Sequence, residues 1–127
     1  MTSVSVVIPV KDAGPQLEAV LAAVREQGDV ELLVIDSGSS DGSRELARAA
    51  GADLIDIAPA DFGHGRTRNL GAERSSGDLI CFLTQDAIPA PGWLAAYREA
   101  FALDERVGAA YGPHLPRADT SPMIARE

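Results

Sequence analysis

Apolar residues in this 127-residue chain fall into two alternating patterns, short β-branched runs and longer runs with helical spacing. The first run, residues 4–10 (VSVVIPV), is apolar on both faces, which is typical of a central parallel strand. Leu17, Val20 and Val24 then recur on one helix face, and Gly28 ends that helix. The predicted strands are residues 4–10, 31–35, 53–57, 79–83 and 107–111, and the helices after the first four strands are expected to end near Gly28, Ala50, Ser75 and Phe101.

This alternation predicts β–α–β units and therefore an α/β fold, an open, mostly parallel, twisted sheet with helices on both faces. Residues 1–127 are expected to form a single domain, because the chain is short and no low-complexity linker interrupts it. Ligands of such sheets bind outside the carboxyl ends of the strands. The polar residues expected at that edge are Lys11 and Asp12, then Asp36 and Ser37, then Thr84, Gln85 and Asp86.

The composition excludes several classes of protein. A net charge of −8 and a pI near 4.6 argue against binding to nucleic acid or to an anionic membrane, because both need a basic surface. The single cysteine, Cys81, excludes an intramolecular disulfide framework and a thiolate zinc site. The chain starts without a basic leader, and no apolar run approaches the ~20 residues of a membrane span. We therefore expect a cytoplasmic protein that can still act on a membrane-bound substrate at the inner face of the membrane.

The segment from Phe62 to Ala87 carries the clearest chemical signal. A basic turn punctuated by glycines, residues 63–69, runs into a helix, and the apolar run 79–83 ends in Thr-Gln-Asp. Cationic side chains and free helix N–H groups near a carboxylate suit a diphosphate and its divalent cation. The alternatives are that Arg66 and Arg68 are solvated on the helix and that Asp86 only caps the loop after it.

Other polar residues also have two interpretations. Asp36 is either a ligand-binding carboxylate or the first residue of an Asx turn, and Asp41 is expected to cap the helix that starts at Ser43. His64, near a helix start, is expected in a neutral hydrogen-bonding role. The turn after the first strand has neither the Gly-x-Gly-x-x-Gly of a dinucleotide-binding domain nor the Gly-Lys-Ser/Thr of a P-loop, so those two nucleotide folds are excluded.

Four ordered motifs together resemble the family 2 glycosyltransferases of the GT-A fold. Residues 4–10 look like the first strand of that family, and residues 34–43 (VIDSGSSDGS) are similar to its Asp-x-x-Ser-x-Asp-Gly-Thr signature. Residues 68–71 (RNLG) resemble its Ala-Arg-Asn-x-Gly, and residues 77–83 (GDLICFL) resemble the approach to its acidic metal motif. The forms F-x-H-G-x-T-R-N and F-L-T-Q-D-A look like the rhamnosyltransferase-like branch of the family, here its N-terminal donor-binding part.

The resemblance implies a site for a nucleotide-diphosphate sugar, with dTDP-rhamnose favoured, and for Mg²⁺ or Mn²⁺. Asp86 would contact the cation as the last aspartate of the family's Asp-x-Asp, although Thr84 replaces the first aspartate. Asp36 would hydrogen-bond the pyrimidine, and Arg68 would approach the base or the diphosphate. The donor-binding residues implied in this way are Pro9, Val10, Asp12, Asp36, Ser37, Arg68, Thr84 and Gln85.

The family's catalytic carboxylate base lies well downstream of these motifs. We therefore expect the base beyond Glu127 and the acceptor-binding half to be absent from this chain. The implied activity is inverting sugar transfer in polysaccharide biosynthesis, to a saccharide or a lipid-linked saccharide. The alternative is a non-catalytic nucleotide-sugar-binding or oligomerisation module. An unpaired sheet edge near residues 107–111 would favour self-association into homo-oligomers.

Overall fold

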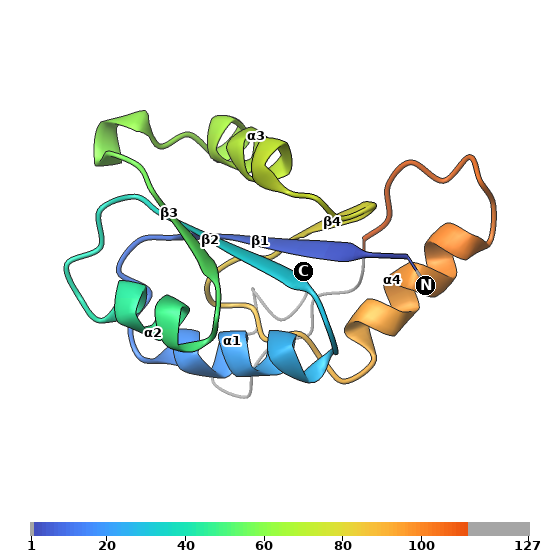
Figure 1. Ribbon diagram of the computed structural model, residues 1–127, viewed down its shortest axis with the longest axis horizontal. Coiled ribbons are helices and arrows are strands. Elements are labelled where there is room, and N and C mark those ends of the chain that lie inside the picture. Colours follow the sequence, from blue (N-terminus) through green and yellow to red (C-terminus); the bar gives the residue numbers. More distant parts are fainter. Residues whose placement is uncertain (1, 112–127) are drawn as a thin grey trace, which may run out of the picture. The chain divides into compact units, whose positions relative to one another are not determined.

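The computed structural model describes residues 2–111, which fall into two compact units, one up to Trp93 and one that begins at Leu94. The first unit contains a four-stranded parallel sheet with the strand order β3-β2-β1-β4 (Figure 1). Its strands are β1 (Val4–Val10), β2 (Glu31–Asp36), β3 (Asp53–Asp56) and β4 (Leu79–Phe82). Its helices are α1 (Gln16–Glu26), α2 (Ser43–Ala49), the short 3₁₀ helix η1 (Pro59–Asp61) and α3 (His64–Arg74), and α4 (Trp93–Ala102) leads into the second unit.

The burial of the strands follows their order in the sheet. The central strands β1 and β2 are buried on both faces, as their continuous apolar runs predict. The outer strands β3 and β4 are only partly buried, and Ile80 and Phe82 of β4 are exposed. The α/β prediction is thus confirmed, with the four strands ending within one residue of their predicted ends.

The helices divide between the two faces of the sheet. Helices α1 and α2 lie on one face, and α3 lies on the other (Figure 1). The chain moves outward from β1 through β2 to β3, and then returns over α3 to β4 on the far side of β1. Right-handed crossovers that run in opposite directions place their helices on opposite faces. The direction therefore reverses between β1 and β4, and this is the switch point at which open sheets bind ligands.

Helix α3 approaches the sheet closely at Gly71. This glycine is buried, and a Cβ built on it would overlap the side chain of Val7 and stand 3.2 Å from Ile35 Cδ1. Leu70 beside it packs against the apolar cluster that Val7 and Ile35 form with Leu33. Glycine at this position lets the helix lie against β1 and β2.

The prediction of a fifth strand at residues 107–111 was wrong. This segment has no regular secondary structure. Three of its five residues, Gly108, Ala109 and Ala110, are poor strand formers. The edge at which self-association was expected is therefore not formed there, and the described sheet ends at β3 and β4. None of the helices within residues 2–111 is long and apolar enough to cross a membrane.

Candidate functional site

The loops that follow β1 and β2 are joined side by side at the carboxyl edge of the sheet. Lys11 Nζ donates to the Gly38 carbonyl at 2.7 Å, and the Asp12 N–H donates to Ser39 Oγ at 2.9 Å. In return, the Ser40 N–H donates to Asp12 Oδ1 at 2.7 Å. Asp12 has a φ of 44°, a left-handed conformation that aspartate tolerates better than most residues do. Asp12 therefore connects the two loops.

Asp41 joins the same two loops from the other side. Its carboxylate accepts from the Gly14 N–H at 3.0 Å and from the Ser43 N–H at 2.9 Å. Hydrogen bonds from the side chain and backbone of Ser43, followed by the one from Gly14, hold the pKa of Asp41 below its usual value. The N-cap residue of α2 is Gly42, so the prediction that Asp41 occupies the cap position was wrong. Asp41 binds the N–H of the first helical residue from one position further out.

Asp36, the last residue of β2, is 1 % exposed and holds the turn that follows it. Its Oδ1 accepts from the N–H groups of Gly38 at 3.0 Å and Ser39 at 2.8 Å, which is the Asx-turn arrangement. Its Oδ2 is buried and has no hydrogen-bond partner among the described residues. Ser37 differs, because its N–H and its hydroxyl both donate to the Val10 carbonyl, at 3.0 and 3.4 Å. The turn therefore uses only half of the Asp36 carboxylate.

A pocket of about 240 Å³ lies at the switch point of the sheet. Residues at the ends of β1 and β4 and at the start of α3 converge on it. The lining residues are Pro9, Val10, Lys11, Phe62, His64, Arg68, Thr84 and Gln85. The structure thus brings together five of the residues that the motifs suggested, and Asp12, Asp36, Ser37 and Asp86 lie outside the lining. Lys11, Phe62 and His64 were not in the expected donor site, although Phe62 and His64 belong to the glycine-rich segment that signalled it.

The start of α3 gives this pocket a positive character. Gly63, the extended N-cap residue, provides no side chain to cap the helix, and no acidic residue occupies the first turn. Arg68 faces the pocket one turn later, and its Nη1 donates to the His64 carbonyl at 3.0 Å. The positive end of a helix dipole and a guanidinium therefore act on the same space, which suits an anionic group.

The turn after β4 forms another wall of the pocket. The Ala87 N–H donates to the Thr84 carbonyl at 3.2 Å and closes this turn around Gln85 and Asp86. Gln85 Oε1 accepts from the Lys11 N–H at 2.9 Å, which fixes the turn to the loop after β1. Asp86 is exposed and follows directly on two lining residues.

Among residues 2–111, the turn after β4 offers a divalent cation too few ligands to hold it without further ones. Within residues 2–111 no group of three or more His, Cys, Asp or Glu side chains could hold a metal ion. Asp86 would be the carboxylate that the turn after β4 offers to the cation. Mg²⁺ commonly binds through one or two carboxylates, with water and substrate phosphates as its other ligands. The exposed Asp86 carboxylate beside a positive pocket is compatible with such a site.

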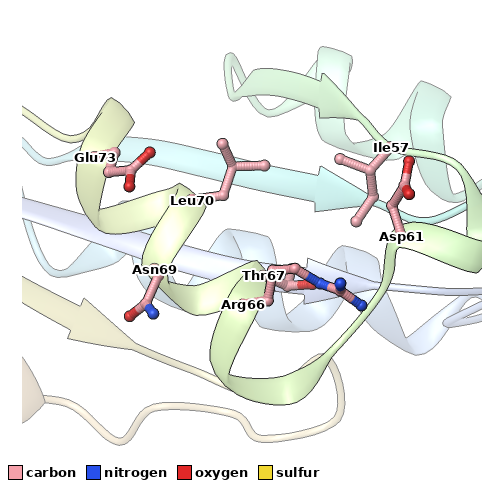
Figure 2. A pocket seen from close by; sticks show the side chains of 7 residues that line it. All are labelled: Ile57, Asp61, Arg66, Thr67, Asn69, Leu70 and Glu73. Carbon is pink, nitrogen blue, oxygen red and sulfur yellow. The ribbon is translucent and has the colours of Figure 1, made fainter.

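A second, larger pocket of about 460 Å³ lies on the opposite flank of α3 (Figure 2). Ile57 and Leu70 form its apolar floor, and both pack against the core cluster under α3. Arg66 lines this pocket, and its Nη2 donates to the Phe62 carbonyl at 3.2 Å, so the two arginines of the basic turn face different pockets (Figure 2). None of the residues expected to bind the donor lines it. We favour the smaller pocket as the functional site, because the loops after β1 and β4 line it and do not line the larger one.

Comparisons with known proteins agree with this fold. The sequence model of glycosyl transferase family 2 matches residues 5–124. The O-antigen chain rhamnosyltransferase RfbN of Salmonella typhimurium is 36% identical over 124 residues, which cover 94% of this chain and 40% of RfbN. The O-antigen chain rhamnosyltransferase WbaN of Salmonella anatum is 38% identical over 96 residues, which cover 73% of this chain and 30% of WbaN.

A solved structure shows the same likeness. Glucosyl-3-phosphoglycerate synthase from Mycobacterium tuberculosis, in complex with Mn²⁺, UDP and glucosyl-3-phosphoglycerate, superposes with a TM-score of 0.62 at 29% identity. The match covers 80% of this chain and 40% of that one. The open parallel sheet corresponds to the N-terminal part of the GT-A fold. The chain belongs to glycosyl transferase family 2, and it spans 40% or less of the length of the two rhamnosyltransferases.

Proposed function

We propose that this chain binds a nucleotide-diphosphate sugar, together with Mg²⁺ or Mn²⁺, in the pocket between the ends of β1 and β4. The observation that carries the proposal is the position of this pocket, at the switch point of the sheet and against the positive start of α3. Open α/β sheets bind ligands at this point, and the start of a helix attracts phosphate.

The nucleoside end of the donor lies, in this proposal, against Pro9 and Val10. Asp36 is paired with Val10 across the sheet, and Val10 lines the pocket, so the proposal assigns the buried Oδ2 of Asp36 to the nucleoside end. A buried carboxylate oxygen without a partner costs free energy, and a ligand that donates a hydrogen bond removes that cost. The N3–H group of uracil or thymine is such a donor. The half-satisfied carboxylate therefore favours a pyrimidine nucleotide.

The diphosphate end lies between Arg68 and the turn at Thr84, Gln85 and Asp86. Arg68 and Lys11 supply positive charge to the pocket. Asp86 would hold the divalent cation, which would add positive charge at the diphosphate. When bound, the cation would stabilise the negative charge of the nucleotide diphosphate as it leaves the sugar. Ser37 and Asp12 support this arrangement indirectly, since their polar groups hold the two loops in place.

The names of the relatives guide the finer assignment. The two Salmonella proteins are O-antigen chain rhamnosyltransferases, and the mycobacterial synthase was solved with UDP and Mn²⁺. We propose dTDP-rhamnose as the donor and a saccharide or lipid-linked saccharide as the acceptor, in bacterial polysaccharide synthesis with inversion at the sugar. The general base and the acceptor site are proposed to belong to the part of the relatives' length that this chain does not span.

Thermal unfolding with dTDP, UDP or GDP, each with and without Mg²⁺ or Mn²⁺, tests the proposal. We expect dTDP or UDP to stabilise the wild-type chain only with the metal, by about 2.7 kcal/mol at a hundredfold excess over Kd. Asp86→Asn should abolish the metal dependence, whereas Asp53→Asn, which changes an exposed carboxylate at the amino end of β3, should keep it. Equal stabilisation of the wild type and Asp86→Asn would refute the metal assignment, and no stabilisation by any nucleotide would refute the donor site.

A further inference from the structure

The side chain of His64 is exposed, and it nevertheless lines the candidate pocket. His64 is the first residue of α3, and it lines the pocket at the switch point together with Arg68. Residues four apart lie on the same face of a helix, and the bond from Arg68 Nη1 to the His64 carbonyl ties the two positions together. The imidazole and the guanidinium therefore face the same space.

The imidazole ring is held by a neighbouring aromatic side chain. The ring centroids of Phe62 and His64 are 5.1 Å apart, and their planes meet at 78°, an edge-to-face pair. Phe62 also lines the pocket. An exposed side chain normally keeps most of its rotamer freedom, and contact with a second ring reduces it. His64 is thus oriented before any ligand arrives, which lowers the entropic cost of a contact with the ligand.

The surroundings of the ring define the ligand group that it can meet. Among the described residues that line this pocket, none is acidic, and Lys11 and Arg68 are cationic. A neutral imidazole offers one N–H donor, and the complementary partner in a positive pocket is an anionic acceptor. Thr84 and Gln85, on the facing turn, directly precede the carboxylate to which we assigned the metal. The phosphoryl oxygens of the donor should therefore lie within reach of the ring.

From this geometry we infer that a ring N–H of His64 donates a hydrogen bond to a phosphoryl oxygen of the donor diphosphate. Phe62 is the positioning residue, because it acts on the donor through the orientation of the imidazole. This inference deepens the proposed function and rests on it. It adds a specificity-determining contact that selects a diphosphate over the bare nucleoside.

The test is calorimetric titration of the 127-residue chain with dTDP and with thymidine, both in the presence of Mg²⁺. His64→Leu should weaken dTDP binding by about tenfold or more, the loss expected for one hydrogen bond to a charged group, and should leave thymidine binding within about twofold. His64→Asn and His64→Gln each restore an N–H donor at a different reach, and at least one should recover most of the dTDP affinity. Phe62→Leu should give a smaller loss, confined to dTDP. Glu73→Gln, an exposed change on the same helix outside this pocket, should bind as the wild type does.

Imidazole NMR spectra separate a direct contact from a structural effect. The chain has two histidines, so the His64 ring signals are identified by their absence in His64→Leu. We expect these signals to shift when dTDP is added and to remain in place with thymidine. Unmoved ring signals and unchanged affinity of His64→Leu, in a chain that binds dTDP, would overturn the inference while the proposed function stands. A wild-type chain that binds no dTDP would overturn both.

Discussion

Strand β2 begins at Glu31 and ends at Asp36, and these two carboxylates of one strand are in opposite situations. At the amino end, Glu31 Oε1 accepts from Ser5 Oγ at 2.7 Å and from the Ser76 N–H at 2.8 Å, while Oε2 accepts from Ser76 Oγ at 2.9 Å. At the carboxyl end, Asp36 uses one oxygen for its own turn and leaves the other buried without a partner among the described residues. At the amino end both oxygens of Glu31 therefore accept hydrogen bonds, whereas at the carboxyl end Asp36 Oδ2 still needs a donor.

This difference gives the two ends of the sheet different roles: the amino end stabilises the fold, and the carboxyl end carries the proposed binding site. The Glu31 contacts join β1 and β2 to the segment between α3 and β4, where the Gly77 N–H also donates to Ser5 Oγ at 2.8 Å. Such fully paired polar groups hold the fold together. An unpaired buried oxygen does the opposite, since it reduces stability until a ligand satisfies it. In the proposed function, the carboxyl end therefore loses some stability and gains a group that can bind a ligand.

The largest effect is expected at Gly71, because α3 connects the two ends. Gly71→Ala places a methyl group against Val7 and should destabilise the fold by about 1–3 kcal/mol. Displacement of α3 should also weaken dTDP binding, since His64 and Arg68 lie on the same helix. Urea unfolding and calorimetry measure both effects. Gly65→Ala is the matched control, because its new methyl group would meet no described atom within 4 Å beyond its chain neighbours and the backbone of its own helix. It should be as stable as the wild type or more so. If Gly71→Ala has the stability and dTDP affinity of the wild type, the close packing of α3 against β1 is refuted.

Acid should weaken the hydrogen bonds that Glu31 accepts at the amino end of β2. The backbone N–H of Ser76, then the hydroxyls of Ser5 and Ser76, hold the pKa of Glu31 below its ordinary value of 4.5. The ionised form therefore stabilises the fold fully above that pH, and this stabilisation is lost as the pH falls through the lower folded value. We expect the urea midpoint of the wild type to fall more between pH 6 and acid than that of Glu31→Gln. Parallel pH profiles of the two chains would contradict the role of Glu31.

The smallest effect is expected for Asp12→Asn in the joined loops of the carboxyl end. Asp12→Asn keeps an acceptor for the Ser40 N–H and tolerates a positive φ, so its stability should stay within about 0.5 kcal/mol of the wild type. Asp12→Val forces a β-branched residue into that conformation and should cost about 1–2 kcal/mol. Thermal unfolding compares the two chains. A valine variant as stable as the asparagine one would mean that the loop relaxes without strain.

Local sequence patterns predicted most of the sheet but missed the contacts between its ends. The β-branched runs of β1 and β2 and the spacing of Leu17, Val20 and Val24 fix elements that are buried in a regular way. The role of Glu31 had no local signal, because its partner Ser76 is 45 residues away in the sequence. Long-range pairs of this kind depend on the register of the strands, which a single pattern does not contain.

The candidate site was predicted only in part, again because a local pattern does not contain the packing of distant segments. Residues 62–69 signalled a phosphate site through glycines and positive charge, and Arg68 does face the pocket between β1 and β4. Arg66, two positions earlier, faces the other flank of the helix, because neighbouring helical residues point in different directions. The motif does not distinguish Arg66 from Arg68. The orientation of α3 on the sheet, where Gly71 allows close packing, decides which arginine faces the candidate site.

The most direct test of this contrast is one measurement of stability and dTDP affinity on two matched amides, Glu31→Gln and Asp36→Asn. Glu31→Gln should lower the free energy of unfolding by about 1–2 kcal/mol, after allowance for solvent screening, and should leave dTDP binding with Mg²⁺ unchanged. Asp36→Asn keeps the acceptor for Gly38 and Ser39, so its stability should hardly change, while dTDP binding should weaken by roughly 10- to 100-fold. Loss of stability without loss of affinity in Asp36→Asn would contradict the account, because the buried carboxylate would then serve the fold and not the ligand.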